Sequence, residues 1–256
     1  MITVGGGIKA ALRWLVRKTG YDLVRYRDGG MPEDFEPLHR DVLRAVGSYT
    51  MTSPERIFGL VEAARYVARH AVPGAVVECG VYKGGSMMAA ALTLQAEGVT
   101  DRDLYLFDTF EGMPEPTGED VDLHGNAAAE EFERRRKQDT NAEWLACSVE
   151  RVREAVQSTG YPAERLHFVQ GDVLETVPSR APEQIALLRL DTDWYASTRH
   201  ELEQLYPRLV PGGVLIIDDY GHFQGARKAV DEYFAAEGVP VLLGRLDYTG
   251  RMCVKR

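Results

Sequence analysis

The sequence predicts an α/β fold with a doubly wound, mostly parallel sheet, and three observations support this prediction. Short and nearly continuous apolar runs alternate with longer stretches whose apolar residues recur at helical spacing. Strands that are apolar on both faces are typical of a parallel sheet covered by helices on both sides. The chain has 256 residues, which is enough for one such domain and too few for two of ordinary size.

The elements of this fold can be placed along the chain in order. A helix is expected over 54–70, because Ser53 can cap it, Pro54 suits its first turn and Glu55 complements its dipole. The seven predicted strands are 75–80, 104–107, 166–170, 185–190, 214–217, 239–246 and 252–255. The helices predicted between them are 86–96, 149–158, 196–208 and 226–236. A turn at 247–250 would join the last two strands into a C-terminal antiparallel hairpin.

The organisation of domains follows from the segments outside this alternation. Residues 1–53 are expected to form an N-terminal helical and loop extension, and residues 54–256 to form the main domain. An amphipathic helix at about 8–18 would pack on its own domain or on a second subunit more often than on a membrane surface. The stretch at about 111–146 is rich in Gly, Pro and charge, and a connection of that length is typical of a lid. Its charged run at 130–137 is expected to be a solvated helix face.

Composition narrows the classes of partner. The net charge of −9 disfavours nucleic acid and anionic membranes as partners. Cys79, Cys147 and Cys253 show no CxxC pair and no disulfide spacing, which favours a reducing compartment. The first residues lack the basic stretch of a signal peptide, and charged residues interrupt the apolar ones that follow. We therefore expect a cytoplasmic protein without a membrane span.

The residues that follow the first strand indicate a cofactor site. In an open α/β sheet, ligands bind beyond the carboxyl ends of the strands. Glu78 stands near the end of the first predicted strand, and the turn at 80–86 is rich in glycine, which lets a ligand approach the backbone. The pattern G-x-G-x-x-G is absent, and the Glu78 carboxylate would repel a diphosphate but suit the ammonium of an amino-acid cofactor. A glycine-rich packing turn without a ligand remains the alternative.

Acids also follow the second and third strands. Asp108 stands where nucleotide-binding α/β folds place an acid that accepts both hydroxyls of a ribose. If the ligand is a nucleoside, Asp172 would lie beside its adenine ring. Either residue could instead cap the helix that follows it.

Four carboxylates follow the fourth and fifth strands. Asp191, Asp193, Asp218 and Asp219 would meet at neighbouring strand ends, and crowding like charges without a counter-ion is costly. A hard cation resolves this conflict, and ligation by oxygen alone indicates Mg²⁺, Mn²⁺ or Ca²⁺ and not structural zinc. Alternatively, the carboxylates face opposite sides of the chain and Asp193 caps the next helix.

These motifs together resemble the macrocin O-methyltransferase family of bacterial natural-product pathways. The resemblance covers about residues 49–233. The segments that carry it are 49–52, 77–85, 107–114, 121–124, 188–193, 206–213 and 217–220. It implies the class I S-adenosylmethionine methyltransferase fold, and it implies methyl transfer to a hydroxyl of a deoxysugar on a macrolide, aminocoumarin or related glycoside, with Mg²⁺. It also implies a homo-oligomer, either a dimer or a tetramer.

The resemblance further implies roles for particular residues. Cofactor contacts would come from Thr50, Met51, Glu78, Gly80, Ser86, Asp108 and Asp172. The metal ligands would be Asp191, Asp218 and Asp219. Asp193 would be the base, with Asp191 as the alternative, and His124 in the lid would lie near the acceptor.

A metal and a base together suit this chemistry. A sugar hydroxyl is about as weak an acid as water, so an unaided aspartate faces a mismatch of roughly 10 pK units. A divalent cation lowers the pKa of an oxygen bound to it by several units, which removes much of this mismatch.

Three other classes of function compete with this hypothesis. A catechol-type phenolic O-methyltransferase usually has a lysine soon after the first metal-binding aspartate, whereas Trp194, Tyr195 and Ala196 follow Asp193 here. An NAD or nucleotide-sugar oxidoreductase would show G-x-G-x-x-G. A non-catalytic scaffold on this fold would need no cluster of carboxylates.

Overall fold

The computed structural model describes residues 14–19, 31–138 and 145–256. The chain divides into two compact units, residues 1–35 and residues 36–256. In the first unit, residues 14–17 are helical, and Trp14 and Leu15 are exposed. Residues 8–13 of the helix predicted at 8–18 lie outside the described residues, and residue 18 is in a turn. The second unit begins earlier than residue 54, and all elements discussed below belong to it.

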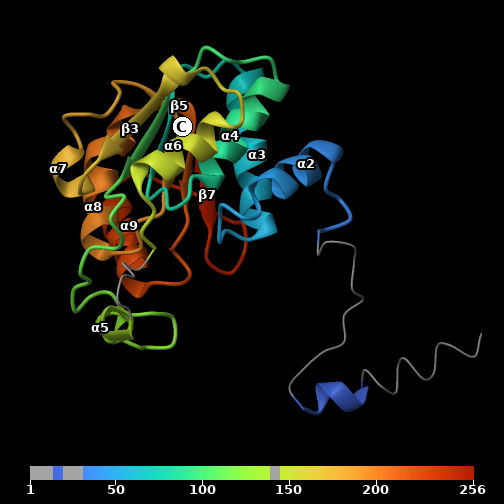
Figure 1. The fold of residues 1–256 in the computed structure, drawn as a ribbon. Coiled ribbons are helices and arrows are strands. Elements are labelled where there is room, and N and C mark those ends of the chain that lie inside the picture. The colour runs from blue at the N-terminus through green and yellow to red at the C-terminus, as the bar shows by residue number, and fades with distance from the viewer. Residues whose placement is uncertain (1–13, 20–30, 139–144) are drawn as a thin grey trace, which may run out of the picture. The chain divides into compact units, whose positions relative to one another are not determined.

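The second unit is built on a seven-stranded sheet with the order β3-β2-β1-β4-β5-β7-β6 (Figure 1). The strands are β1 (Ala75–Cys79), β2 (Leu104–Asp108), β3 (Leu166–Gln170), β4 (Ile185–Leu190), β5 (Leu209–Ile217), β6 (Gly244–Arg245) and β7 (Arg251–Val254). β1 to β5 pair in parallel, and β7 joins β5 in the antiparallel direction. The predicted fold class is therefore confirmed. The strand order reverses between β1 and β4, which is where ligands bind in such sheets.

The helices are α2 (Pro37–Val46), α3 (Pro54–Arg69), α4 (Gly85–Ala96), α5 (Ala128–Gln138), α6 (Val149–Gln157), α7 (Val173–Thr176), α8 (Tyr195–Leu205) and α9 (Gln224–Glu237). They cover both faces of the sheet, except for α5, which belongs to the lid segment and lies away from the sheet (Figure 1). α3 begins where the sequence predicts, because the Ser53 side chain accepts a hydrogen bond from the Arg56 amide at 3.2 Å. α2 was not predicted, and it packs against α3 and α4. Within the described residues, no helix is long and apolar enough to cross a membrane.

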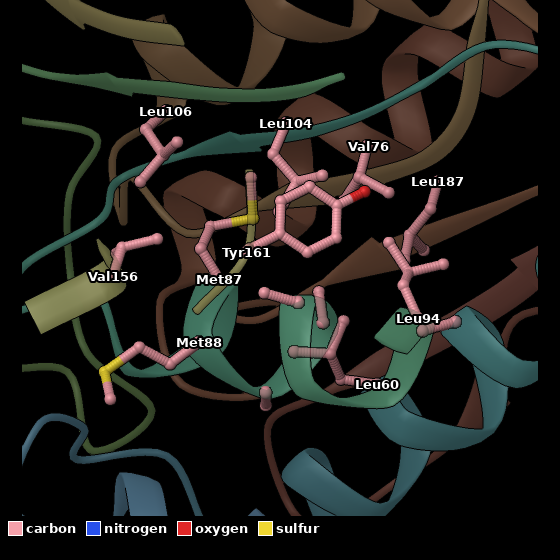
Figure 2. Packing of buried hydrophobic residues seen from close by; sticks show 14 of the residues in the cluster. Leu60, Val76, Met87, Met88, Leu94, Leu104, Leu106, Val156, Tyr161 and Leu187 are labelled. Carbon is pink, nitrogen blue, oxygen red and sulfur yellow. The ribbon is translucent and has the colours of Figure 1, made fainter. Parts of the chain in front are cut away.

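Alternation along the strands assigns side chains to two separate cores. Val76 and Leu187 belong to a core covered by α2, α3, α4 and α6, whereas Val77 and Leu188 belong to one covered by α8 and α9. Figure 2 shows part of the first core, in which Leu94 of α4 points toward Leu187 of β4. All five residues of β1 are buried, as expected for a parallel strand between two helical layers.

The predicted strand at 239–246 is wrong outside Gly244–Arg245, the two residues that form β6. Pro240 has no amide hydrogen for a ladder, and β6 lies at the edge of the sheet, where one neighbour is missing. The turn at 247–250 does connect two antiparallel strands, as predicted.

The segment predicted to be a lid joins β2 to α6 and is attached to the main unit by a buried acid. Asp120 is fully buried, and its carboxylate accepts hydrogen bonds from the Tyr195 amide at 2.8 Å and from the Thr117 amide at 2.7 Å. The Trp194 indole donates to the carbonyl of Pro114 at 2.9 Å. The lid is thereby connected to the beginning of α8, directly after the carboxylates that follow β4.

Candidate active site

A cavity of about 360 Å³ lies beyond the carboxyl ends of β1 and β4. It is bounded by the glycine-rich turn after β1, the acids after β2, β4 and β5, the segment before α3 and part of the lid. The sequence-predicted residues in its lining are Thr50, Met51, Gly80, Ser86, Asp108, Asp191, Asp193, Asp218 and Asp219. The structure thus brings most of the predicted site together in one space.

The glycine-rich turn is shaped by close backbone approach. Gly80 has φ +82°, and a methyl group on it would overlap the carbonyl oxygen of Asp191. A Cβ on Gly85 would lie 2.7 Å from the Tyr49 carbonyl oxygen, and the Gly85 amide donates to that oxygen at 3.2 Å. Glycine is required at both positions, and the packing at Gly85 brings Thr50 against the turn.

Asp108 fixes the same turn through backbone amides. Its Oδ2 accepts from the Val81 and Tyr82 amides at 2.6 and 3.0 Å, and its Oδ1 accepts from the Phe110 amide at 2.7 Å. The carboxylate also lines the cavity. It therefore stiffens the turn whether or not a ribose is bound.

Arg189 is the centre of the carboxylate cluster. It lies opposite Glu78 in the register of β1 and β4, and it is 3% exposed. Its Nη1 donates to Glu78 Oε1 at 2.5 Å and to Asp191 Oδ2 at 2.7 Å, while its Nη2 donates to Asp218 Oδ1 at 2.6 Å. The other oxygen of Asp218 accepts from Arg56 of α3. Two arginines, Arg56 and Arg189, therefore supply part of the counter-charge that the sequence argument assigned to a cation alone.

Glu78 lies behind the cavity and not in its lining. It is 1% exposed, and its Oε2 has no hydrogen-bond partner among the described residues. Burial raises the pKa of Glu78 to about 8, against the opposing attraction of Arg189. Glu78 therefore acts on the cavity through Arg189, which it shares with Asp191 and Asp218.

Asp191, Asp218 and Asp219 form the set that the sequence predicted for a cation. One carboxylate oxygen from each lies within 4.8 Å of the others. Burial, together with the charge of Asp191, raises the pKa of Asp219 to about 7. Within the described ranges, no arginine or lysine forms an ion pair with Asp219.

Asp193 shares this part of the cavity with Asp219. Its backbone has φ +65°, and its amide donates to Asp219 Oδ2 at 3.2 Å. Burial and the neighbouring charges of Asp219 and Asp191 raise the pKa of Asp193. The two carboxyl groups thus favour a shared proton over two full charges. This excess of negative charge and the all-oxygen donor set fit a hard divalent cation.

Comparison with known proteins identifies the family. The model of the macrocin O-methyltransferase family (TylF) matches residues 34–255. The chain belongs to this family. A rhamnosyl-tetracenomycin-C 4'-O-methyltransferase from Streptomyces olivaceus is 36% identical, over 79% of this chain and 74% of that protein. The mycinamicin III 3''-O-methyltransferase from Micromonospora griseorubida is 32% identical, over 79% of this chain and 77% of that protein.

Solved structures agree with this assignment. The O-methyltransferase NovP has a TM-score of 0.71 and 27% identity, and the match covers 97% of this chain and 98% of that one. A calicheamicin methyltransferase has a TM-score of 0.60 at 20% identity, over 91% of this chain and 99% of that one, and so shows the same fold. The protein is therefore an S-adenosylmethionine-dependent O-methyltransferase of the class I fold.

The cavity lining lacks three of the residues predicted for this methyltransferase, namely Glu78, Asp172 and His124. Asp172 caps α7 by accepting from the Leu174 amide at 2.8 Å, which is the alternative role considered for it. His124 is exposed in the lid, where its amide donates to Asp122 Oδ1 at 2.8 Å. Asp193, by contrast, does not cap α8; Asp120 of the lid accepts from the first amide of that helix.

The structure also adds residues that the sequence did not indicate. His222 and Tyr248 line the cavity, and the Tyr248 hydroxyl lies 3.4 Å from His222 Nδ1. Burial lowers the pKa of His222 below its ordinary value. His222 could have been predicted from the sequence, because it comes shortly after Asp218 and Asp219 at the end of a strand. Arg56 and Tyr248 come from segments far apart in the sequence, and no local pattern marks them.

Proposed function

We propose that this methyltransferase transfers the methyl group of S-adenosylmethionine to a sugar hydroxyl of a glycosylated natural product, with a divalent cation held by Asp191, Asp218 and Asp219. The observation that carries the proposal is the single cavity in which the glycine-rich turn and the carboxylate cluster meet. The relatives support the acceptor class, because one acts on a rhamnosyl tetracenomycin and another on mycinamicin III.

The residues of the turn would bind and orient the cofactor. Gly80 directly after β1 and Ser86 at the beginning of α4 offer a close backbone approach, and Thr50 and Met51 would close over the cofactor from the segment before α3. Methyl transfer is an in-line displacement, so holding the donor still relative to the acceptor accounts for a large part of catalysis.

Asp193 is proposed as the base that takes the proton of the acceptor hydroxyl. Among the described residues its carboxyl has no ion pair with an arginine, whereas Asp191 is held by Arg189 at 2.7 Å. Its raised pKa makes it a stronger base than an ordinary aspartate. A bound divalent cation would supply the Lewis acidity that brings the pKa of the sugar hydroxyl within reach of this base.

The test is a screen with controlled metal content. The enzyme is incubated with S-adenosylmethionine and a panel of glycosides that includes rhamnosides, and mass spectrometry detects the gain of one methyl group. A catechol is included to examine the phenolic alternative. We expect methylated glycosides, loss of turnover after EDTA treatment, and recovery with Mg²⁺ or Mn²⁺.

Three results would count against parts of this proposal. Full turnover with the metal shown to be absent would exclude the role of the cation. Methylation of the catechol alone would replace the sugar acceptor by a phenol. A monomer in light scattering would contradict the oligomer implied by the family resemblance, which stays a prediction, as does the cytoplasmic location.

A further inference from the structure

The active-site cavity is small for the reaction proposed above, on which this inference rests. Its volume of about 360 Å³ is near the lower end of the range for ligand pockets, which is roughly 300–1,000 Å³. The cavity must receive both the cofactor and the sugar that is methylated. The remainder of a glycoside therefore needs space outside it.

Two further cavities border the active-site cavity at His222 and Phe223, which line all three. One has about 530 Å³ and lies between the lid and the beginning of α9; we call it the α9 cavity. Besides the shared pair, its lining includes Leu123, Tyr220, Arg227, Lys228, Asp231 and Glu232. The other has about 540 Å³ and lies beside α5; we call it the α5 cavity.

The charges around the α9 cavity are already paired. Lys228 Nζ lies 2.7 Å from Glu119 Oε2, Arg227 Nε lies 3.6 Å from Asp231 Oδ2, and the Tyr220 hydroxyl donates to Asp231 Oδ1 at 2.7 Å. The positive charges of Arg227 and Lys228 in the lining are therefore neutralised by nearby acids. Such a lining suits a neutral group better than an ionic one.

An apolar side chain also faces this space from the lid. Leu123 lines the α9 cavity and is 42% exposed, so a ligand there would remove its surface from water. The α5 cavity is instead lined by the acids Asp122, Glu130 and Glu131 together with Arg134. A neutral, largely apolar group would therefore favour the α9 cavity.

We propose that the α9 cavity binds the aglycone of a neutral glycoside while its sugar reacts in the active-site cavity, with His222 and Phe223 between the two. Phe223 is held at this border by an edge-to-face contact with Trp194, whose ring centroid lies 5.1 Å away. The backbone amide of Gln224, the next residue, donates to the Val121 carbonyl at 2.8 Å and thereby holds the lid loop near the cavity. The border is thus built from fixed elements and not from a free side chain.

The experiment uses matched pairs of acceptors, namely the 4-methylumbelliferyl and the methyl glycosides of the same sugars, rhamnose among them. kcat/KM is measured for methyl transfer, and binding to the enzyme loaded with S-adenosylhomocysteine is measured by calorimetry. We expect wild-type enzyme to prefer the aryl glycoside at least tenfold. Leu123→Glu should reduce this preference about tenfold, equivalent to about 1.4 kcal/mol.

A matched control is Leu242→Glu, which makes the same change at an exposed leucine outside the three cavities. It should keep the wild-type preference, and melting temperatures verify that both variants are folded. The proposal is overturned if the two variants behave alike, or if wild-type enzyme shows no preference for the aryl glycoside. Methylation of both glycosides without preference would leave the proposed function intact, whereas methylation of neither would contradict the function itself.

Discussion

The two halves of the active-site cavity are held in place by different forces. The glycine-rich turn after β1 is defined by backbone geometry, with Gly80 against the Asp191 carbonyl and Asp108 bound by three backbone amides. The carboxylate cluster is defined by side-chain charge, with Arg189 shared by three acids. The turn therefore tolerates little change of shape, and the cluster tolerates little change of charge.

Arg189 is where the two halves meet. Its partner Glu78 is the β1 residue that lies opposite it in the sheet, two positions before Gly80, and its other partners are Asp191 and Asp218. Replacing an acid of the cluster can therefore alter the position of Arg189, and through its ion pair with Glu78 the position of the turn. Substitutions in each half and at Arg189 therefore measure how far the halves are separable, and the largest effect is expected at Asp193.

Asp193→Asn should affect chemistry and spare the turn. Removing a general base typically costs about 10²–10⁴-fold in rate, so kcat should fall by that factor. The affinity for S-adenosylhomocysteine should stay within about twofold of wild type, because among the described residues the hydrogen bond of Asp193 goes to Asp219 and not to the turn. Single-turnover kinetics and calorimetry measure the two quantities.

The matched variant is Asp191→Asn, since Asp191 belongs to the proposed ligand set and is bound by Arg189. It should also weaken Mn²⁺ binding, followed by electron paramagnetic resonance. If Asp191→Asn keeps the metal and loses only chemistry, while Asp193→Asn loses the metal, the two roles are reversed.

Arg189→Met should destabilise both halves. It leaves Glu78, Asp191 and Asp218 without the guanidinium they share, and breaking such buried ion pairs typically costs about 3–5 kcal/mol in the free energy of unfolding. Chemical denaturation measures this loss, and Arg189→Lys, which keeps the charge, should lose less.

The loss of stability in Arg189→Met should grow as pH increases. The pKa of Glu78 is already raised to about 8 in the folded protein, so the folded state binds this proton more tightly than the unfolded chain does. Stability should therefore fall in both proteins as pH increases from about 5 to 8. Without Arg189 the pKa of Glu78 rises further, so the stability of the variant should keep falling above pH about 8, where the contribution of Glu78 in wild type levels off. A variant whose stability levels off at the same pH as that of wild type would show that Arg189 does not lower the pKa of Glu78.

Much of the fold was predictable because its determinants are local. The strands at 166–170 and 185–190 have the predicted bounds, since each is a short apolar run between polar segments. The carboxylate cluster was predictable from the parallel topology, which places consecutive strand ends at one edge. The strand at the edge of the sheet was harder to predict. Its apolar residues suggested a long strand, but Pro240 has no amide hydrogen for the ladder and an edge strand has only one neighbour.

The counter-ions were not predictable in the same way. Arg189 stands within an apolar run, and its role appears only when the register places it opposite Glu78. Arg56 reaches Asp218 from α3 across 162 positions of sequence. Pairing at such distance is a property of the tertiary structure, whereas a glycine with positive φ is marked by its own turn.

Gly80→Ala should affect the turn without changing any charge. The added methyl group would overlap the backbone carbonyl of Asp191, and φ +82° is itself costly for a residue with a Cβ, by about 1–3 kcal/mol. We expect a loss of stability of about this size and weaker binding of S-adenosylhomocysteine, measured by denaturation and calorimetry.

Gly98→Ala separates the two contributions. Gly98 also has a positive φ, +76°, but a Cβ there would meet nothing within 4 Å, so this variant reports backbone strain alone. It should lose about 1 kcal/mol of stability and keep its affinity for the cofactor product. If Gly80→Ala costs no more than Gly98→Ala, close approach to Asp191 is not what defines the turn, and the contrast between a half defined by shape and a half defined by charge is wrong.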